Sequence, residues 1–89
     1  MINLDKFLSG EVAYVIDRDS EDVFLSELES KCNIKWLSGD RPTKYKDYWT
    51  LYNEGEDIVL GIVRKMGVVG LSHGYRDDFK NYEVEVFQC

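Results

Sequence analysis

The side chains best suited to binding chemistry lie between residues 35 and 52, where basic residues alternate with large aromatic ones. The members of this basic aromatic stretch are Lys35, Arg41, Lys44, Lys46, Trp36, Tyr45, Tyr48, Trp49 and Tyr52. Aromatic rings stack on planar bases and basic groups bind phosphate, so the stretch is suited to a nucleotide-like ligand. The residues expected to bind such a ligand are Arg41, Lys44, Tyr45 and Tyr48.

The same stretch has two other interpretations. Tyrosine, tryptophan and arginine dominate the energetics of protein interfaces, so it could contact a protein partner instead. Alternatively, Trp36 and Trp49 belong to the hydrophobic core and the tyrosines line its rim.

A second candidate surface is acidic. Seven acidic residues and one basic residue lie between Glu11 and Ser30, and the whole chain carries a net charge of −6. This balance disfavours direct nucleic-acid binding and favours docking to a basic partner, such as a nucleic-acid-binding protein. A solvated helix face would also account for the charge run. The acids expected on the outer face of a helix are Glu21, Asp22, Glu27 and Glu29.

Metal and cofactor sites are not expected. An EF-hand loop starting at Asp17 would need glycine at its sixth position and glutamate at its twelfth, which are Asp22 and Leu28 here. The only thiol and imidazole ligands, Cys32, His73 and Cys89, lack the spacing typical of zinc sites.

An enzyme using His73 with nearby carboxylates is a minor alternative. No triad-like motif accompanies this histidine, and Cys32 lies on the apolar stripe of a predicted helix, where a buried thiol is the usual role. Gly67, Gly70 and Gly74 fall in a hairpin pattern instead of leading into a helix, so they predict no phosphate cradle.

The elements that must position these residues form a single α+β domain over residues 1–89. The pattern predicts one main amphipathic helix packed on a mostly antiparallel sheet of four to six strands, with a short N-terminal helix. The helices are expected over residues 3–9 and 20–32, and the strands over 11–17, 34–38, 49–53, 57–65, 68–73 and 82–86. The first strand, the main helix and 34–38 are expected to form a right-handed strand–helix–strand unit, and 74–81 a polar loop. The expected core includes Val15, Phe24, Leu28, Trp36, Leu60 and Val84.

No apolar run approaches the roughly 20 residues that span a bilayer, and no secretory signal pattern is present. Nothing demands a disulfide between the two cysteines. We therefore expect a cytoplasmic protein without a membrane partner.

Two short motifs resemble a loose group of small, uncharacterised bacteriophage accessory proteins. They are the Trp-x-Ser-Gly turn from Trp36 to Gly39, which follows the acidic helix, and the Tyr-rich final strand from Tyr82 to Phe87. The resemblance spans most of the chain, although the hairpin over 57–73 is longer than in that group. It implies a viral origin and a location in the host cytoplasm.

Small phage accessory proteins often bind and block host factors, including CRISPR and nucleotide-signalling defence systems. By analogy, the leading hypothesis is a non-enzymatic, anti-defence (anti-CRISPR-like) protein that binds a host protein. The alternative is a small-ligand binder that sequesters a nucleotide-type signal.

Overall fold

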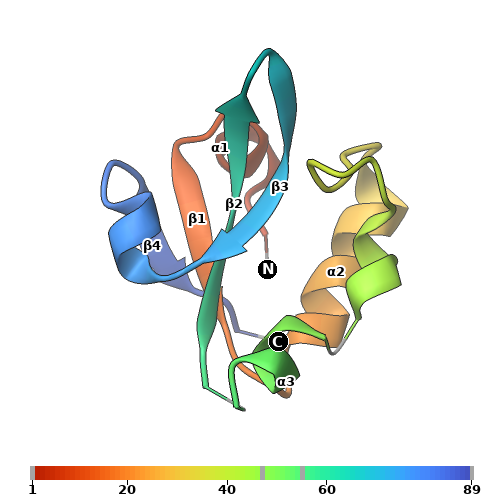
Figure 1. Cartoon of the computed structure of the whole chain (residues 1–89), viewed down its shortest axis with the longest axis vertical. Coiled ribbons are helices and arrows are strands. Elements are labelled where there is room, and N and C mark those ends of the chain that lie inside the picture. Colours follow the sequence, from red (N-terminus) through yellow and green to blue (C-terminus); the bar gives the residue numbers. More distant parts are fainter. Residues whose placement is uncertain (1, 47, 55, 89) are drawn as a thin grey trace.

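Four strands form one mixed sheet in the computed structural model, which describes residues 2–46, 48–54 and 56–88. The strands are β1 (Val12–Ile16), β2 (Ile58–Lys65), β3 (Val68–Gly74) and β4 (Glu83–Val86). Their order across the sheet is β3-β2-β1-β4 (Figure 1). The β1–β2 and β2–β3 pairs are antiparallel and the β1–β4 pair is parallel. The predicted α+β fold with a mostly antiparallel sheet is confirmed.

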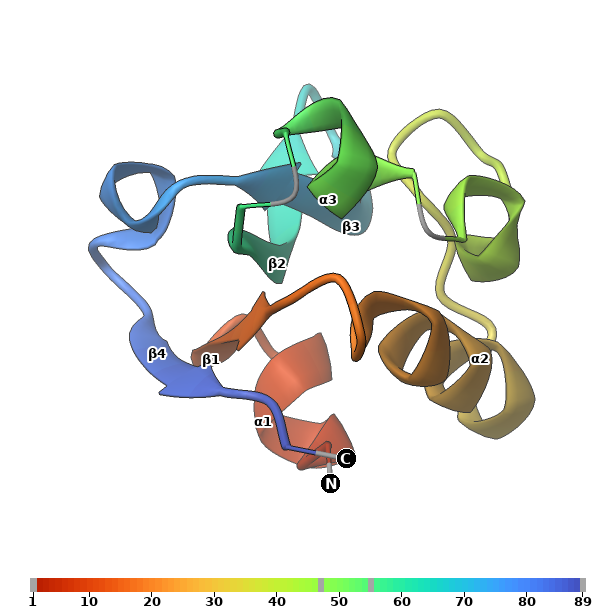
Figure 2. The same cartoon turned by 90° about the horizontal axis from the view of Figure 1, so that it is seen from below.

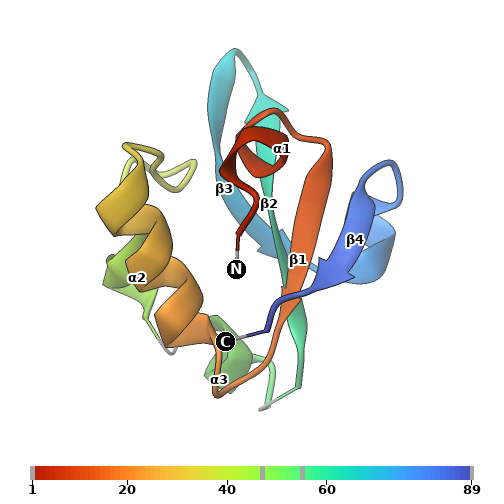
Figure 3. The same cartoon turned by 180° about the vertical axis from the view of Figure 1, so that it is seen from behind.

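The described residues also form three α-helices and two 3-10 helices around this sheet. They are α1 (Leu4–Leu8), α2 (Glu21–Lys31), α3 (Trp49–Tyr52), η1 (Pro42–Tyr45) and η2 (Arg76–Phe79). Helix α1 begins where the Asn3 side chain accepts a hydrogen bond from the Lys6 backbone N–H at 3.2 Å. Seen from behind, α1 lies in front of the sheet and α2 runs beside it (Figure 3). The two helices expected from the sequence are therefore present, and α2 is the main one.

Strand β1 is buried on both faces, as its nearly continuous apolar sequence predicts. Val12, Tyr14 and Ile16 join the main core, which contains α1 and α2 side chains. Ala13 and Val15 face the other way and pack in a smaller cluster with Phe79 of η2. Helices α1 and η2 accordingly lie on opposite sides of the sheet (Figure 2).

The main core is organised around the ring of Phe24 on α2. This ring lies 5.6 Å from that of Phe7, 5.7 Å from Tyr14 and 5.0 Å from Phe87, measured between centroids. Tilted and edge-to-face contacts of this kind are the favoured arrangement of aromatic rings. Of the predicted core residues, Val15, Phe24, Leu28, Trp36 and Leu60 are buried, whereas Val84 is only partly buried.

The predicted strand over residues 34–38 is wrong. It is reduced to one parallel bridge between Trp36 and Leu71 of β3, at the edge of the sheet opposite β4. The backbone approaches β3 closely there, because a Cβ atom on Gly70 would come within 2.9 Å of the Leu37 nitrogen. A single bridge is therefore all that the described residues form in place of the second strand of the predicted strand–helix–strand unit.

Two further segments differ from expectation. Residues 49–52 form helix α3, where the sequence predicts a strand. The segment predicted as a polar loop over 74–81 contains η2, and its Phe79 side chain is buried against the sheet. Both differences depend on contacts with distant parts of the chain.

The burial of Leu28 generates a stability prediction. Leu28→Ala should lower the free energy of unfolding by ~2–5 kcal/mol, because it leaves a cavity among fully buried side chains. Urea unfolding followed by tryptophan fluorescence measures this. Val23→Ala is the matched control, since Val23 lies on the same helix but is 44% exposed, and it should change stability by less than ~0.5 kcal/mol. Equal effects of the two substitutions would contradict this packing.

Candidate functional site

Helix α3 is held in place by the carboxylate of Glu21, the first residue of α2. The Glu21 side chain is fully buried. Its oxygens accept hydrogen bonds from the Trp49 N–H (2.9 Å), the Thr50 N–H (3.0 Å) and the Thr50 hydroxyl (2.6 Å). The first N–H groups of a helix lack partners within the helix, and a negative charge at this end is favourable. The expectation that Glu21 lies on an outer, accessible face is therefore wrong, and it cannot touch a partner.

The other three acids of the expected acidic face are also engaged within the chain. Glu29 accepts two hydrogen bonds from Thr43, one from its N–H (3.2 Å) and one from its hydroxyl (2.6 Å). These bonds, led by the hydroxyl, lower the pKa of Glu29. Asp22 forms an ion pair with Lys46 at 3.4 Å. Through these contacts α2 binds the segment that carries the basic aromatic residues.

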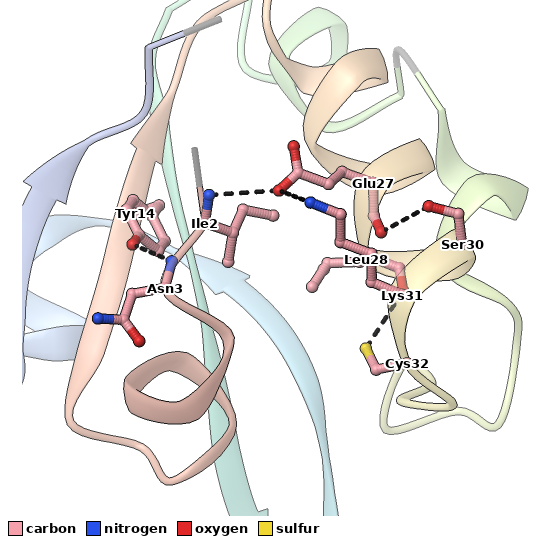
Figure 4. A network of polar contacts seen from close by, with 8 residues as sticks. All are labelled: Ile2, Asn3, Tyr14, Glu27, Leu28, Ser30, Lys31 and Cys32. Atoms are coloured by element: carbon pink, nitrogen blue, oxygen red, sulfur yellow. Dashed lines mark hydrogen bonds and ion pairs between the residues drawn. The ribbon is translucent and has the colours of Figure 1, made fainter.

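Glu27 turns towards the N-terminal segment instead. Its carboxylate accepts a hydrogen bond from the Ile2 N–H at 3.3 Å and forms an ion pair with Lys31 at 3.3 Å (Figure 4). The neighbouring Asn3 N–H donates to the Tyr14 hydroxyl at 2.9 Å. Glu27 thus helps to attach the start of the described chain to α2.

Internal contacts also occupy part of the basic aromatic stretch. Lys44 pairs with Asp40 at 3.4 Å, and the Tyr45 hydroxyl donates to the same carboxylate at 3.1 Å. Hydrogen bonds from Ser38 and then Tyr45 lower the pKa of Asp40 and, reciprocally, the pKa of Tyr45 is raised. Arg41 is exposed. The charges of Lys44 and Lys46 are therefore partly neutralised by Asp40 and Asp22.

The structure gathers the aromatic rings of this region into one cluster. Its members, which we call the aromatic cluster, are Trp36, Tyr45, Tyr48, Trp49, Tyr52 and His73. The rings of Trp49 and His73 are stacked, with centroids 3.5 Å apart and planes 22° apart. His73 comes from β3, so this stack joins the short helix α3 to the sheet. The sequence places Tyr45 and Tyr48 in a candidate site but does not bring His73 to them.

Two hollows flank the Trp49–His73 stack. The first, which we call the tyrosine hollow, has a volume of about 270 Å³ and is lined by Trp49, Tyr52, Asn53, Ile58, His73, Gly74, Tyr75 and Asp78. The second, of about 220 Å³, is lined by Trp36, Leu37, Ser38, Tyr45, Trp49, Leu71, Ser72 and His73. Apolar and aromatic walls with a few polar groups are typical of binding sites.

Burial and neighbouring charges act in opposite directions on the pKa of the His73 imidazole. Burial lowers its pKa below the ordinary value of 6.5, while the negative charges of Glu21 and Asp78 act in the opposite direction. The lowered pKa favours the neutral form of His73 at pH 7. Nearby, the Trp49 Nε1 is buried and has no hydrogen-bond partner within the described residues.

The polar contacts of His73 and Cys32 are the features relevant to catalysis. Within residues 2–46, 48–54 and 56–88, the His73 imidazole makes no hydrogen bond to a nucleophile or a carboxylate. The Cys32 thiol donates to the Leu28 carbonyl at 3.2 Å, within its own helix end. Among the described side chains, no group of three His, Cys, Asp or Glu residues is arranged to hold a metal ion. None of the described helices is long and apolar enough to cross a membrane.

Comparisons with known proteins add no relative: no family model, curated protein or solved structure matches this chain. The function of the chain is therefore inferred from its geometry.

The role of Glu21 can be tested by an isosteric substitution. Glu21→Gln replaces one carboxylate oxygen with an NH₂ group, which then faces a backbone N–H donor of α3. The free energy of unfolding should fall by ~1–3 kcal/mol, because a buried donor loses its partner. Asp22→Asn, which removes only an exposed ion pair, should cost less than ~1 kcal/mol in the same urea titration. A smaller loss for Glu21→Gln than for Asp22→Asn would show that Glu21 does not fix α3.

The environment of His73 predicts a pH dependence. NMR titration of this residue, the only histidine in the chain, should give a pKa below 6.5. Because the unfolded state then binds a proton more readily than the folded state, stability should fall as the pH decreases through 6.5. His73→Phe, which keeps a ring in the stack, should remove this part of the pH dependence. A pKa above 6.5 would mean that the charges of Glu21 and Asp78 outweigh burial.

Proposed function

We propose that this chain is a non-enzymatic, phage-type accessory protein that binds and blocks a host protein through three exposed tyrosines. Tyr48, Tyr52 and Tyr75 are 46%, 73% and 61% exposed. The rings of Tyr48 and Tyr52 are stacked with centroids 6.2 Å apart, and the Tyr75 hydroxyl donates to Asn53 of the α3 C-cap at 2.8 Å. We call these three residues the tyrosine patch, and this patch is the observation that carries the proposal.

Exposed tyrosines in one patch are suited to protein contacts for a physical reason. Each supplies a large, rigid apolar area together with a polar hydroxyl, and only a few such residues dominate the affinity of most interfaces. The patch lies over helix α3 and the turn before η2, next to the tyrosine hollow. A partner could therefore bury the patch and insert a side chain at the same time.

The tyrosine patch is a different contact surface from the acidic helix face expected from the sequence. Glu21 is buried and Glu29 is bonded to Thr43, so these acids stabilise the fold. The net charge of −6 still favours a basic partner, because long-range attraction speeds the encounter of oppositely charged proteins. The choice of a host defence protein in the host cytoplasm rests on the resemblance to phage accessory proteins.

A second candidate function is sequestration of a nucleotide-type signal. The observation that favours it is the pair of hollows that Trp49 and His73 both line, because flat heterocycles stack on such rings. The residues expected from the sequence to bind this ligand are Arg41, Lys44, Tyr45 and Tyr48. Tyr45 lines one of the two hollows, whereas the other three are not among the described residues that line either hollow.

The proposed function predicts which surface the partner needs. Tyr48→Ser combined with Tyr52→Ser should reduce recovery of the host partner from lysate at least tenfold, because loss of interface hot-spot residues typically costs about 2 kcal/mol or more. The measurement is quantitative mass spectrometry of proteins retained by the immobilised chain. Asp22→Asn combined with Glu27→Gln is the control, and it should retain the partner within about threefold, since both acids form ion pairs within the chain at its surface and such pairs contribute little.

The reverse result, with loss only in the acid variant, would assign the interface to α2. Comparison of the native and denatured masses of the purified chain tests the nucleotide alternative. A retained small molecule that disappears with Arg41→Ala, but not with the double tyrosine variant, would favour a ligand over a protein partner.

A further inference from the structure

We propose that the tyrosine hollow is a receptor for a cationic side chain, specifically an arginine presented by the protein partner. This inference rests on the proposed function, because it assumes that the partner is a protein. It adds the chemistry by which that partner is recognised.

The aromatic lining of the hollow suits a cation. Tyr52 and Tyr75 have rings that are mostly exposed, so ring faces are free to accept a ligand. The rings of Trp49 and Tyr52 are nearly perpendicular, at 77°, with centroids 6.1 Å apart, and therefore form a corner. The face of an aromatic ring carries negative charge density that attracts cations within about 6 Å.

Two carboxylates lower the electrostatic potential in this hollow. Asp78 lines it directly, and both Asp78 and the buried Glu21 act on His73 so as to favour its protonated form. One oxygen of Asp78 accepts a hydrogen bond from the Tyr75 N–H at 2.8 Å. A carboxylate has further lone pairs, and Asp78 forms no ion pair with any described residue, so it can accept bonds from a ligand.

The same features disfavour a phosphate group. No lysine or arginine is among the described residues that line the hollow, and Lys44 and Lys46 are paired with Asp40 and Asp22. Arg76 lines a neighbouring hollow of about 340 Å³ together with Asp57 and Asp77, so acids outnumber cations there too.

Size and shape select arginine. The tyrosine hollow, at about 270 Å³, lies below the ~300–1,000 Å³ typical of sites for drug-sized ligands, and it suits one side chain. A guanidinium is planar, so it can stack on a tyrosine ring while its N–H groups donate to a carboxylate. An ammonium group is a compact point charge that cannot do both in one plane.

The test is an NMR titration of the full chain with Nα-acetyl-arginine methylamide. The matched probe is the citrulline analogue, which has nearly the same shape and no charge. The imidazole resonances of His73 and the indole N–H of Trp49 should shift saturably with the arginine probe, and the citrulline probe should bind at least tenfold more weakly. The arginine affinity should also fall with added salt, because the attraction is partly ionic.

Variants connect these shifts to the hollow. Asp78→Asn keeps an oxygen that can accept the Tyr75 N–H bond but removes the charge, and Tyr52→Leu removes an exposed ring without disturbing the core. Each should weaken arginine binding at least threefold. Leu51→Ala is the control, since Leu51 is exposed on the same helix but does not line the hollow.

Equal binding of the arginine and citrulline probes would overturn the inference, as would shifts that survive both variants. Tighter binding of adenosine monophosphate than of arginine would instead favour the nucleotide alternative. If the arginine probe fails to bind while the double tyrosine variant still loses the host partner, only the cation receptor is wrong and the proposed function stands.

Discussion

The arrangement of the site depends on one buried carboxylate. Glu21 is taken out of water, which is costly for a charge unless hydrogen bonds compensate for the lost hydration. The compensation comes from two backbone N–H groups at the start of α3 and from the Thr50 hydroxyl. Because these donors exist in this geometry only when the chain turns into a helix at Trp49, the carboxylate and α3 stabilise each other. This mutual support also fixes the position of the Trp49 ring over His73.

Other acids of α2 also hold the segment from residue 43 to 50 against this helix, through hydrogen bonds and an ion pair. The acids of α2 contact polar or basic residues between 43 and 50 at Glu29–Thr43, Asp22–Lys46 and Glu21–Thr50, and the last of these contacts is buried. The acidic face and the basic aromatic stretch, which appear as separate surfaces in the sequence, therefore bind each other in part. Large aromatic and aliphatic side chains, namely Tyr48, Leu51, Tyr52 and Tyr75, are exposed in this region, and this shifts the expected mode of recognition from charge pairing to ring contacts.

The sequence predicts elements well where local apolar spacing decides the structure. Helix α2 has its stripe of Phe24, Leu25 and Leu28, and β1 and β2 have apolar runs, so all three lie close to their expected positions. Prediction fails for 49–53, since Trp, Thr and Tyr favour strands and only the distant Glu21 makes a helix preferable.

The site is harder to predict than the fold for a related reason. Tyr45 and Tyr48 are adjacent to the tryptophans in sequence, so their grouping is foreseeable. His73, Tyr75 and Asp78 reach the hollow only because the β2–β3 hairpin brings the chain back to α3.

The pairing of strand β4 has a kinetic consequence of its own. Strand β4 lies parallel to β1, and the Phe87 N–H that follows it donates a hydrogen bond to the Val15 carbonyl. The Phe87 ring packs on Phe24. During synthesis, β1 and α2 therefore emerge long before this partner exists, so the nascent chain carries an unfinished core until β4 has been made and the long loop between β1 and β4 has closed.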